Sequence, residues 1–301
     1  KTDLWEVRTN HGRILEASAD ASLIGYHPFT LEYGRFRPRD ANRIYVPMPQ
    51  QIADDALRTG DVCGLTPDAA LGQLLGEWIA GTAPVSDVFA KTAAAGRVPG
   101  VLNSSSEFRA AAINAAVSSS SIVVKGTLSI PCADQLTAQA LLVLLLTFGI
   151  SASAVGNSVR IYRGHVRRLE KLAEVPTEAF RSTDPDLVPF PKILAEMLEK
   201  RGEDFSRVRK WLKADLLPRR AALAVAKKYE KDLLWVGAVR EDNWRAVESL
   251  SSTSSALPLG PNFLALVHAR DLRWDRVRST RSSRTADSFD ITVGDAGSPT
   301  F

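Results

Sequence analysis

The side chains best suited to proton transfer in this sequence are its four histidines. Histidine has an ordinary pKa close to neutrality, so it can protonate a leaving group at physiological pH. His27 is followed by Pro28, a context more typical of a turn histidine than of a catalyst. His11 lies in a predicted turn and His165 in a basic stretch, which favours solvated side chains. The apolar run around His268 favours a core position for that residue.

Cysteine content and charge limit the remaining chemistry. Cys63 and Cys132 are too few for a disulfide framework or a complete zinc site, so we expect a reducing cytoplasmic setting, no resident metal and no cofactor. The net charge of +4 permits a polyanion such as double-stranded DNA as partner without requiring one. The longest apolar run, 138–146, suits a buried helix, and the N-terminal residues lack a signal-peptide core, so no membrane partner is expected.

A group of cations falls in three short helices predicted at 193–200, 205–213 and 219–231. A helix-turn-helix protein lays one such helix in the DNA major groove. The cations that would contact DNA are Arg207, Arg209, Lys210, Lys213, Arg219 and Arg220. Because acids such as Glu203 and Asp215 lie among them, a solvated charged face on a small bundle is an equally good interpretation.

The segment 98–150 predicts a helix, a strand and a second helix. Alanines dominate the first helix, at 106–117, so its backbone can approach a partner helix closely. A serine run, 118–121, follows it, and Lys125-Gly126 divides the β-branched run 122–130 with a turn. The second helix, 133–148, is apolar and is closed by Gly149.

This segment resembles the second half of a LAGLIDADG homing endonuclease of the kind found inside inteins, and 74–82 resembles that family's first motif helix. The resemblance implies an acidic residue at the end of each motif helix, where two carboxylates hold Mg²⁺ for phosphodiester cleavage. The corresponding positions here are Gly81 and Ser120, which are degenerate endonuclease positions without carboxylates; in the first motif the alternative is the loss of one residue between Ala80 and Gly81. We therefore expect that DNA cleavage is lost and that Mg²⁺ would be a cofactor only if activity remained. The alternative is an active nuclease in which other acids, such as Glu77 or Asp87, bind the metal ion.

The two ends of the chain carry a second resemblance, to the Hint splicing fold of inteins. His27, the following Gly-Arg-Phe-Arg-Pro and a strand ending at Val46-Pro47 are similar to the family's histidine box. Another register, at 18–21, would place alanine where the histidine belongs. Near the C-terminus, a Trp-Asp strand at 272–277 precedes a strand containing Asp290, which is similar to the family's closing strands. The resemblance implies that His27 protonates the amide leaving group and that Asp290 tunes a nearby thiol or histidine.

Together these patterns predict a mixed α+β protein. We expect an all-β Hint domain formed by 1–60 and 261–301, interrupted by a degenerate α/β LAGLIDADG-like domain at 61–175 and a helical module at 176–260. The function implied is self-splicing by acyl shift, transesterification and Asn cyclisation, with flanking exteins of a host protein as partners. The chain begins at Lys1 and lacks the terminal splicing residues, which predicts trimming, disorder or a complementary intein fragment. The alternative is a DNA-binding protein without splicing activity.

Overall fold

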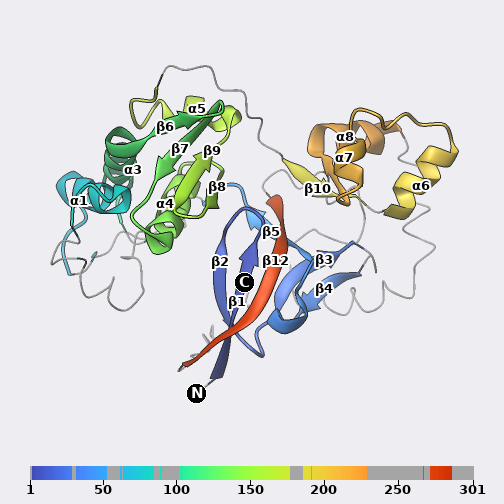
Figure 1. Ribbon diagram of the computed structural model, residues 1–301, viewed down its shortest axis with the longest axis horizontal. Coiled ribbons are helices and arrows are strands. Elements are labelled where there is room, and N and C mark those ends of the chain that lie inside the picture. The colour runs from blue at the N-terminus through green and yellow to red at the C-terminus, as the bar shows by residue number, and fades with distance from the viewer. Residues whose placement is uncertain are drawn as a thin grey trace, which may run out of the picture. The chain divides into compact units, whose positions relative to one another are not determined.

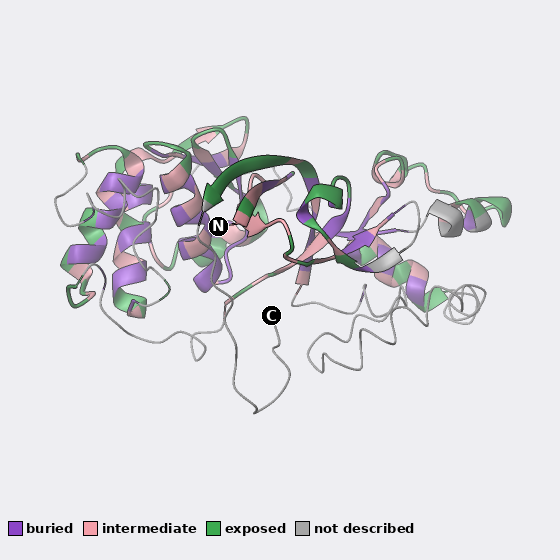
Figure 2. Cartoon of the chain, turned by 90° about the horizontal axis from the view of Figure 1, so that it is seen from below, coloured by how far each residue is buried: buried purple, intermediate pink, exposed green. Residues whose placement is uncertain are grey.

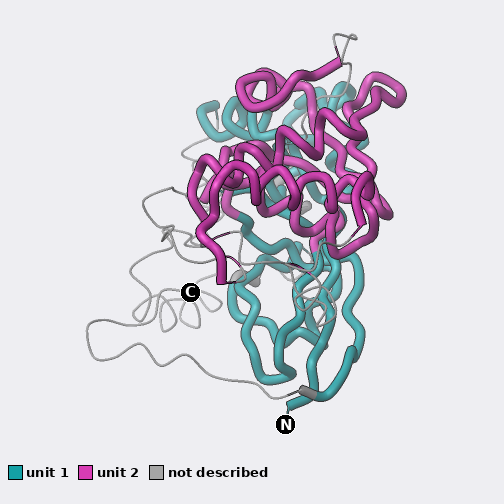
Figure 3. The backbone as a smooth tube through the Cα atoms, turned by 90° about the vertical axis from the view of Figure 1, so that its left-hand side faces the viewer, with its two compact units in different colours: residues 1–10, 14–48, 185–301 teal, residues 11–13, 49–184 magenta. Residues whose placement is uncertain are grey.

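The computed structural model describes residues 2–28, 32–52, 62, 64–84, 89, 102, 104–176, 186–190, 192–228, 267 and 272–286. The protein is of the mixed α+β class, as the sequence predicts, and its sheets are antiparallel. Two compact units divide it (Figure 3). Unit 1 comprises residues 1–10, 14–48 and 185–301, and unit 2 comprises 11–13 and 49–184.

Unit 1 is built on a six-stranded sheet with the order β2-β1-β12-β5-β3-β4 (Figure 1). The strand bounds are Thr2–Thr9 for β1, Ile14–Ser18 for β2, Leu23–His27 for β3, Glu32–Phe36 for β4, Tyr45–Pro49 for β5 and Leu272–Ala286 for β12. The long strand β12 lies between β1 and β5, and Trp5 is paired with Ser282. Segments from opposite ends of the chain therefore form the middle of one sheet.

The apolar side chains of this sheet are buried in two clusters. The smaller cluster contains Val7, Ile44 and Val277, beside the single-turn helix η1 at Pro38–Asp40. In the larger cluster, Tyr26, Tyr45 and Trp274 of the sheet share a core with residues of the segment 186–228. Along β1, Glu6, Val7 and Thr9 are buried and only Asp3 is exposed, so this strand is covered over much of its length and does not alternate strictly.

The segment 186–228 contains two short strands and three helices. Their bounds are Leu187–Pro189 for β10, Lys192–Lys200 for α6, Arg209–Leu212 for α7, Leu216–Pro218 for β11 and Arg219–Lys228 for α8. The sequence predicts only helices in this module, whereas the structure also contains β10 and β11, which pair antiparallel. Leu217 and Val188 are fully buried in the shared core, so apolar burial favours strand pairing there.

Unit 2 contains helices on one face of a second antiparallel sheet. Its elements are Ala69–Ala80 for α1, Ser106–Ser120 for α3, Ile122–Val124 for β6, Thr127–Pro131 for β7, Gln135–Thr147 for α4, Ala152–Val155 for β8, Ser158–Ile161 for β9 and Arg163–Leu169 for α5. The sheet order is β6-β7-β9-β8. Figure 2 shows buried residues in both the helices and the strands of this unit, and these residues form one core cluster.

Local sequence signals explain the boundaries of these helices. Asp68 and Ser105 accept hydrogen bonds from backbone N–H groups in the first turns of α1 and α3. Asp134 and Thr137 form a reciprocal capping box at the start of α4. The helix α3 continues through Ser120, three residues beyond the predicted end, so most of the serine run is helical. No helix among the described residues has both the length and the apolar character of a bilayer-spanning segment.

Candidate functional sites

His27 is the last residue of β3 and is half-buried. Its backbone pairs with Glu32 of β4, and its ring lies 6.5 Å from that of Phe36 between centroids. The residue therefore belongs to a strand that ends at a turn, with its position fixed by sheet pairing. Asp290 and His268, and the second predicted closing strand, lie outside the described residues, as do Cys63 and Asp87.

The predicted Trp-Asp strand is present as the first part of β12. Trp274 and Asp275 are both buried, at 2% and 1% relative exposure. Close by in the same core, Tyr45 of β5 donates a hydrogen bond from its hydroxyl to Ala214 O at 2.7 Å. Burial raises the pKa of Tyr45 to about 12. Tyr45 is therefore a neutral donor at physiological pH that links the sheet to the segment before β11.

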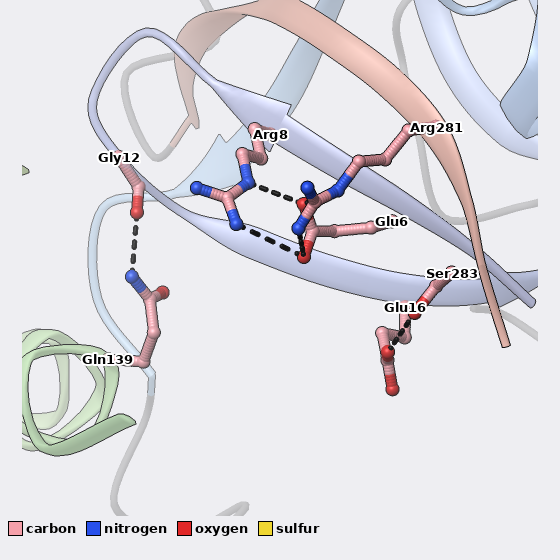
Figure 4. Close-up of polar contacts among 7 residues, drawn as sticks. All are labelled: Glu6, Arg8, Gly12, Glu16, Gln139, Arg281 and Ser283. Atoms are coloured by element: carbon pink, nitrogen blue, oxygen red, sulfur yellow. Dashed lines mark hydrogen bonds and ion pairs between the residues drawn. The ribbon is translucent and has the colours of Figure 1, made fainter. Parts of the chain in front are cut away.

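A cluster of charges on β1 and β12 was not predicted from the sequence. Figure 4 shows the carboxylate of Glu6 between the guanidinium groups of Arg8 and Arg281. Arg281 Nε lies 2.9 Å from Glu6 Oε1, and Arg8 Nη2 lies 3.2 Å from Glu6 Oε2. The hydrogen bond from Arg8, with that from Arg281, lowers the pKa of Glu6 to about 2 against the effect of its burial. Glu6 and Arg8 are on the same face of β1, whereas Arg281 lies beside Glu6 because of the pairing register between β1 and β12.

Helices α1 and α3 of unit 2 form a closely packed pair. A Cβ added at Gly72 would lie 2.3 Å from Phe108 O, and one added at Gly76 would lie 2.3 Å from Ala112 O. Such distances are far below van der Waals contact, so the two backbones touch directly where these glycines lie. The predicted close approach of the alanine-rich helix is therefore present in the structure, with α1 as its partner.

The two helices run in the same direction. At their starts, Ser105 Oγ donates a hydrogen bond to Pro67 O at 2.8 Å. At their ends, Ala133 N donates to Ile79 O at 2.8 Å, and Ser120 Oγ lies 3.1 Å from Pro131 O. The two degenerate endonuclease positions therefore lie on either side of the same segment, 131–133.

Neither position offers a metal ligand of the required kind. Gly81 is the C-cap of α1 with φ +71°, in the left-handed region that favours glycine. Ser120 also contacts Ala116 O, so its hydroxyl is turned toward backbone carbonyls. Within the described residues there is no group of three or more His, Cys, Asp or Glu side chains that could hold a metal ion. Glu77, the recruited alternative, accepts a hydrogen bond from Gln73 and lines a groove between α1 and α3.

The predicted DNA-contacting cations are of two kinds. Arg207, Arg209, Lys210, Lys213 and Arg220 are exposed. Arg219 is 6% exposed, and its guanidinium donates to Asp186 Oδ2, Val267 O and Leu272 O. The prediction that Arg219 contacts DNA is therefore corrected, because its N–H groups are directed into the protein. The spacing of charged residues along a predicted helix could not reveal the burial of Arg219, because spacing does not show which face of the helix packs against another segment.

A scan against protein-family models finds no match to this chain, and a search of the curated proteins finds none either.

Proposed function

We propose that this protein is an intein, with a splicing body formed by unit 1 and an inserted, cleavage-inactive nuclease-like body formed by unit 2. The observation that carries the proposal is the central place of β12 between β1 and β5. A splicing protein has to bring its two ends together, and here N-terminal and C-terminal strands are adjacent in one sheet. The unit interrupting them has its own core, as an inserted domain requires.

Splicing requires protonation of an amide nitrogen as the acyl group moves to a thiol or hydroxyl. In this proposal His27 supplies that proton, and Asp290 tunes a nearby group. A positioned general acid typically contributes about 10²–10⁴-fold to such a step. The placement of His27 at the end of a paired strand supports the role, because a strand fixes the position of a side chain better than a loop does.

Flanking exteins joined to the full chain and its terminal splicing segments provide the test. We expect ligated exteins from the unmodified chain and a loss of at least tenfold in the rate of ligation with His27→Ala. His165→Ala, in α5 of unit 2, is the control and should splice like the parent. If the parent, His27→Ala and His165→Ala splice equally well, the assignment of His27 as the proton donor is wrong. If the parent ligates no exteins, the proposed function is wrong.

Loss of DNA cleavage is a separate part of the proposal. Mg²⁺-dependent cleavage needs oxygen ligands of high charge density, and the ends of α1 and α3 present Gly81 and Ser120 instead. We expect a plasmid that carries the intein-free insertion site to remain uncut in the presence of Mg²⁺. Cleavage that disappears in Glu77→Gln would support the alternative of a recruited acid.

A second candidate function, DNA binding without splicing, is favoured by the charge distribution around α7. Among the described acids of 201–228, Glu203 is paired with Lys228 and Asp215 is buried. Asp204 is exposed and accepts hydrogen bonds from Ser206, which leave its negative charge in place. The exposed cations of this segment outnumber this one exposed acid. We call the five of them that the sequence predicts as DNA contacts the α7 basic surface: Arg207, Arg209, Lys210, Lys213 and Arg220.

A gel-shift titration with salt tests this candidate. If the α7 basic surface contacts phosphates, affinity falls steeply with salt, and Lys210→Gln with Lys213→Gln reduces the slope of log K against log salt by about 2. Lys171→Gln, at an exposed lysine of unit 2, is the control and should leave the slope unchanged. No binding at low salt, or the same slope in every variant, would exclude phosphate binding by this surface.

A further inference from the structure

Arg219 is the first residue of α8, and its side chain is buried. Its backbone N–H donates to Asp186 O at 2.7 Å, and its Nε donates to Asp186 Oδ2 at 2.8 Å. Both bonds attach the start of α8 to the residue directly before β10. Because β10 pairs with β11 immediately before α8, this attachment closes the strand pair.

The other end of the guanidinium reaches the C-terminal part of the chain. Nη1 donates to Val267 O at 2.8 Å, and Nη2 donates to Leu272 O at 2.6 Å. Leu272 is the first residue of β12. A guanidinium is a planar fork that can hold several acceptors in one fixed geometry, which the mobile ammonium of lysine cannot do. We call this set of contacts among Arg219, Asp186, Val267 and Leu272 the Arg219 junction.

The apolar surroundings of the Arg219 junction link the same elements. Leu217 of β11 and Ala222 of α8 share the buried cluster with Trp274, two residues beyond Leu272. Burying an arginine is costly unless its donors are bonded, so a buried arginine with carbonyl and carboxylate acceptors fixes one arrangement of the segments that it joins. The segment 186–228 and the start of β12 therefore form one structural assembly.

We propose that Arg219 is a positioning residue for the splicing reaction, holding the start of β12 so that the chain beyond it reaches the splice junction. The segment 186–228 is then part of the splicing body and not a detachable DNA-binding appendage. This inference rests on the proposed function, since the placement of β12 affects a reaction only if the chemistry occurs at the chain ends. Asp290 follows β12 in sequence, which puts the expected effect on the C-terminal step.

The test compares Arg219→Met, Arg219→Lys and Lys227→Met in the full chain carrying exteins and terminal splicing segments. Methionine keeps the aliphatic length and removes every donor, while lysine keeps the charge and some donors. Lys227 is the matched control because it is a cation of the same helix and is exposed. Two quantities are measured: hydrogen exchange of the amides at 272–277, and the rates of N-terminal and C-terminal cleavage.

We expect Arg219→Met to raise exchange at 272–277 at least tenfold, with exchange in α4 of unit 2 unchanged. C-terminal cleavage should slow at least tenfold more than thiol-induced N-terminal cleavage, and Arg219→Lys should recover part of the loss. Lys227→Met should match the parent. A merely structural role predicts equal loss of both cleavages, so that result would overturn the proposal, as would unchanged exchange.

Failure of the proposed function is distinguishable from failure of this inference. If the parent chain performs neither cleavage, the proposed function is wrong and the positioning role of Arg219 in splicing falls with it, although exchange at 272–277 still reports whether the junction holds β12. If Arg219→Met does not fold, Arg219→Lys carries the same comparison of the two cleavage rates. Equal slowing of both in that variant would also overturn the proposal.

Discussion

Individual residues of unit 1 show how cross-strand register creates an interaction that composition does not reveal. The carboxylate of Glu6 lies between Arg8 on its own strand and Arg281 on β12. The folded-state pKa of Glu6, about 2, is below its ordinary value of 4.5. Ionised Glu6 therefore stabilises the folded state above about pH 4.5, and this contribution is lost as the pH falls toward 2.

We predict that Glu6→Gln lowers the free energy of unfolding at pH 7 by about 1–2 kcal/mol, a range reduced from the full linkage value because Arg281 is largely exposed to solvent. Urea denaturation at pH 7 and near pH 2 measures the effect, which should shrink at the lower pH. Glu199→Gln, at an exposed position of α6, is the control and should change stability little. An effect of Glu6→Gln that is independent of pH would contradict this electrostatic origin.

Residue-level prediction from sequence succeeds where chemistry is local. The serine at 120 and the glycine at 81 show directly that no carboxylate is present, whatever the fold. Exposure is different, because it depends on which face of an element meets another part of the chain. Arg219 and Arg220 are identical and adjacent, yet one is buried and the other exposed. Charge spacing alone therefore assigned them the same role, and only the structure separates them.

Among the secondary-structure elements, α1 and α3 can pack closely because two positions of α1, Gly72 and Gly76, have no side chain. The helix of α1 carries Gly72 and Gly76 in its interior, where glycine ordinarily costs about 1 kcal/mol relative to alanine. Here each faces a backbone carbonyl of α3 at a distance that leaves no room for a methyl group. Close packing between the helices offsets the lower helix propensity.

We predict that Gly76→Ala destabilises unit 2 by about 1–3 kcal/mol, because the added Cβ would lie 2.3 Å from Ala112 O and 2.6 Å from Ala115 Cβ. Gly164→Ala is the matched control. Gly164 is inside the helix α5, and a Cβ there has no neighbour within 4 Å among the described residues. The control should leave stability unchanged or raise it by up to about 1 kcal/mol. Chemical denaturation followed by a unit 2 probe distinguishes them, and similar effects in both would argue against backbone contact.

The elements of unit 2 were more predictable than those of 186–228 for a physical reason. The turn between β6 and β7 has positive φ at both Lys125 and Gly126, and glycine in a short turn between β-branched residues is a local hairpin signal. The apolar length of α4 is also a local signal. By contrast, β10 and β11 are three residues each and contain proline, so nothing in their sequence predicts pairing across the helices between them.

At the scale of the whole molecule, the core of unit 1 contains no residues of unit 2. It does contain residues of the segment 186–228. The sheet of unit 1 has β12 paired with β1, while its larger core needs Leu217, Phe190 and Leu198 against Tyr26 and Trp274. The core of unit 2 contains none of these residues. The sequence predicts a helical module at 176–260. The described residues 186–190 and 192–228 of that range are grouped with the six-stranded sheet in unit 1.

We predict that replacing 49–184 with a flexible Gly/Ser linker leaves unit 1 folded, whereas replacing 186–228 in the same way unfolds it. The first change removes a body with its own core, and lengthening or shortening a connection alters loop-closure entropy only slowly with its length. The second change exposes Tyr26, Tyr45 and Trp274 to water and removes the donor that holds Leu272. Hydrogen exchange at Val7 and Val277, which are buried in the smaller cluster, measures the outcome. Full protection after loss of 186–228 would show that the sheet stands without its helical segment, and would remove the physical basis for assigning that segment to the splicing body.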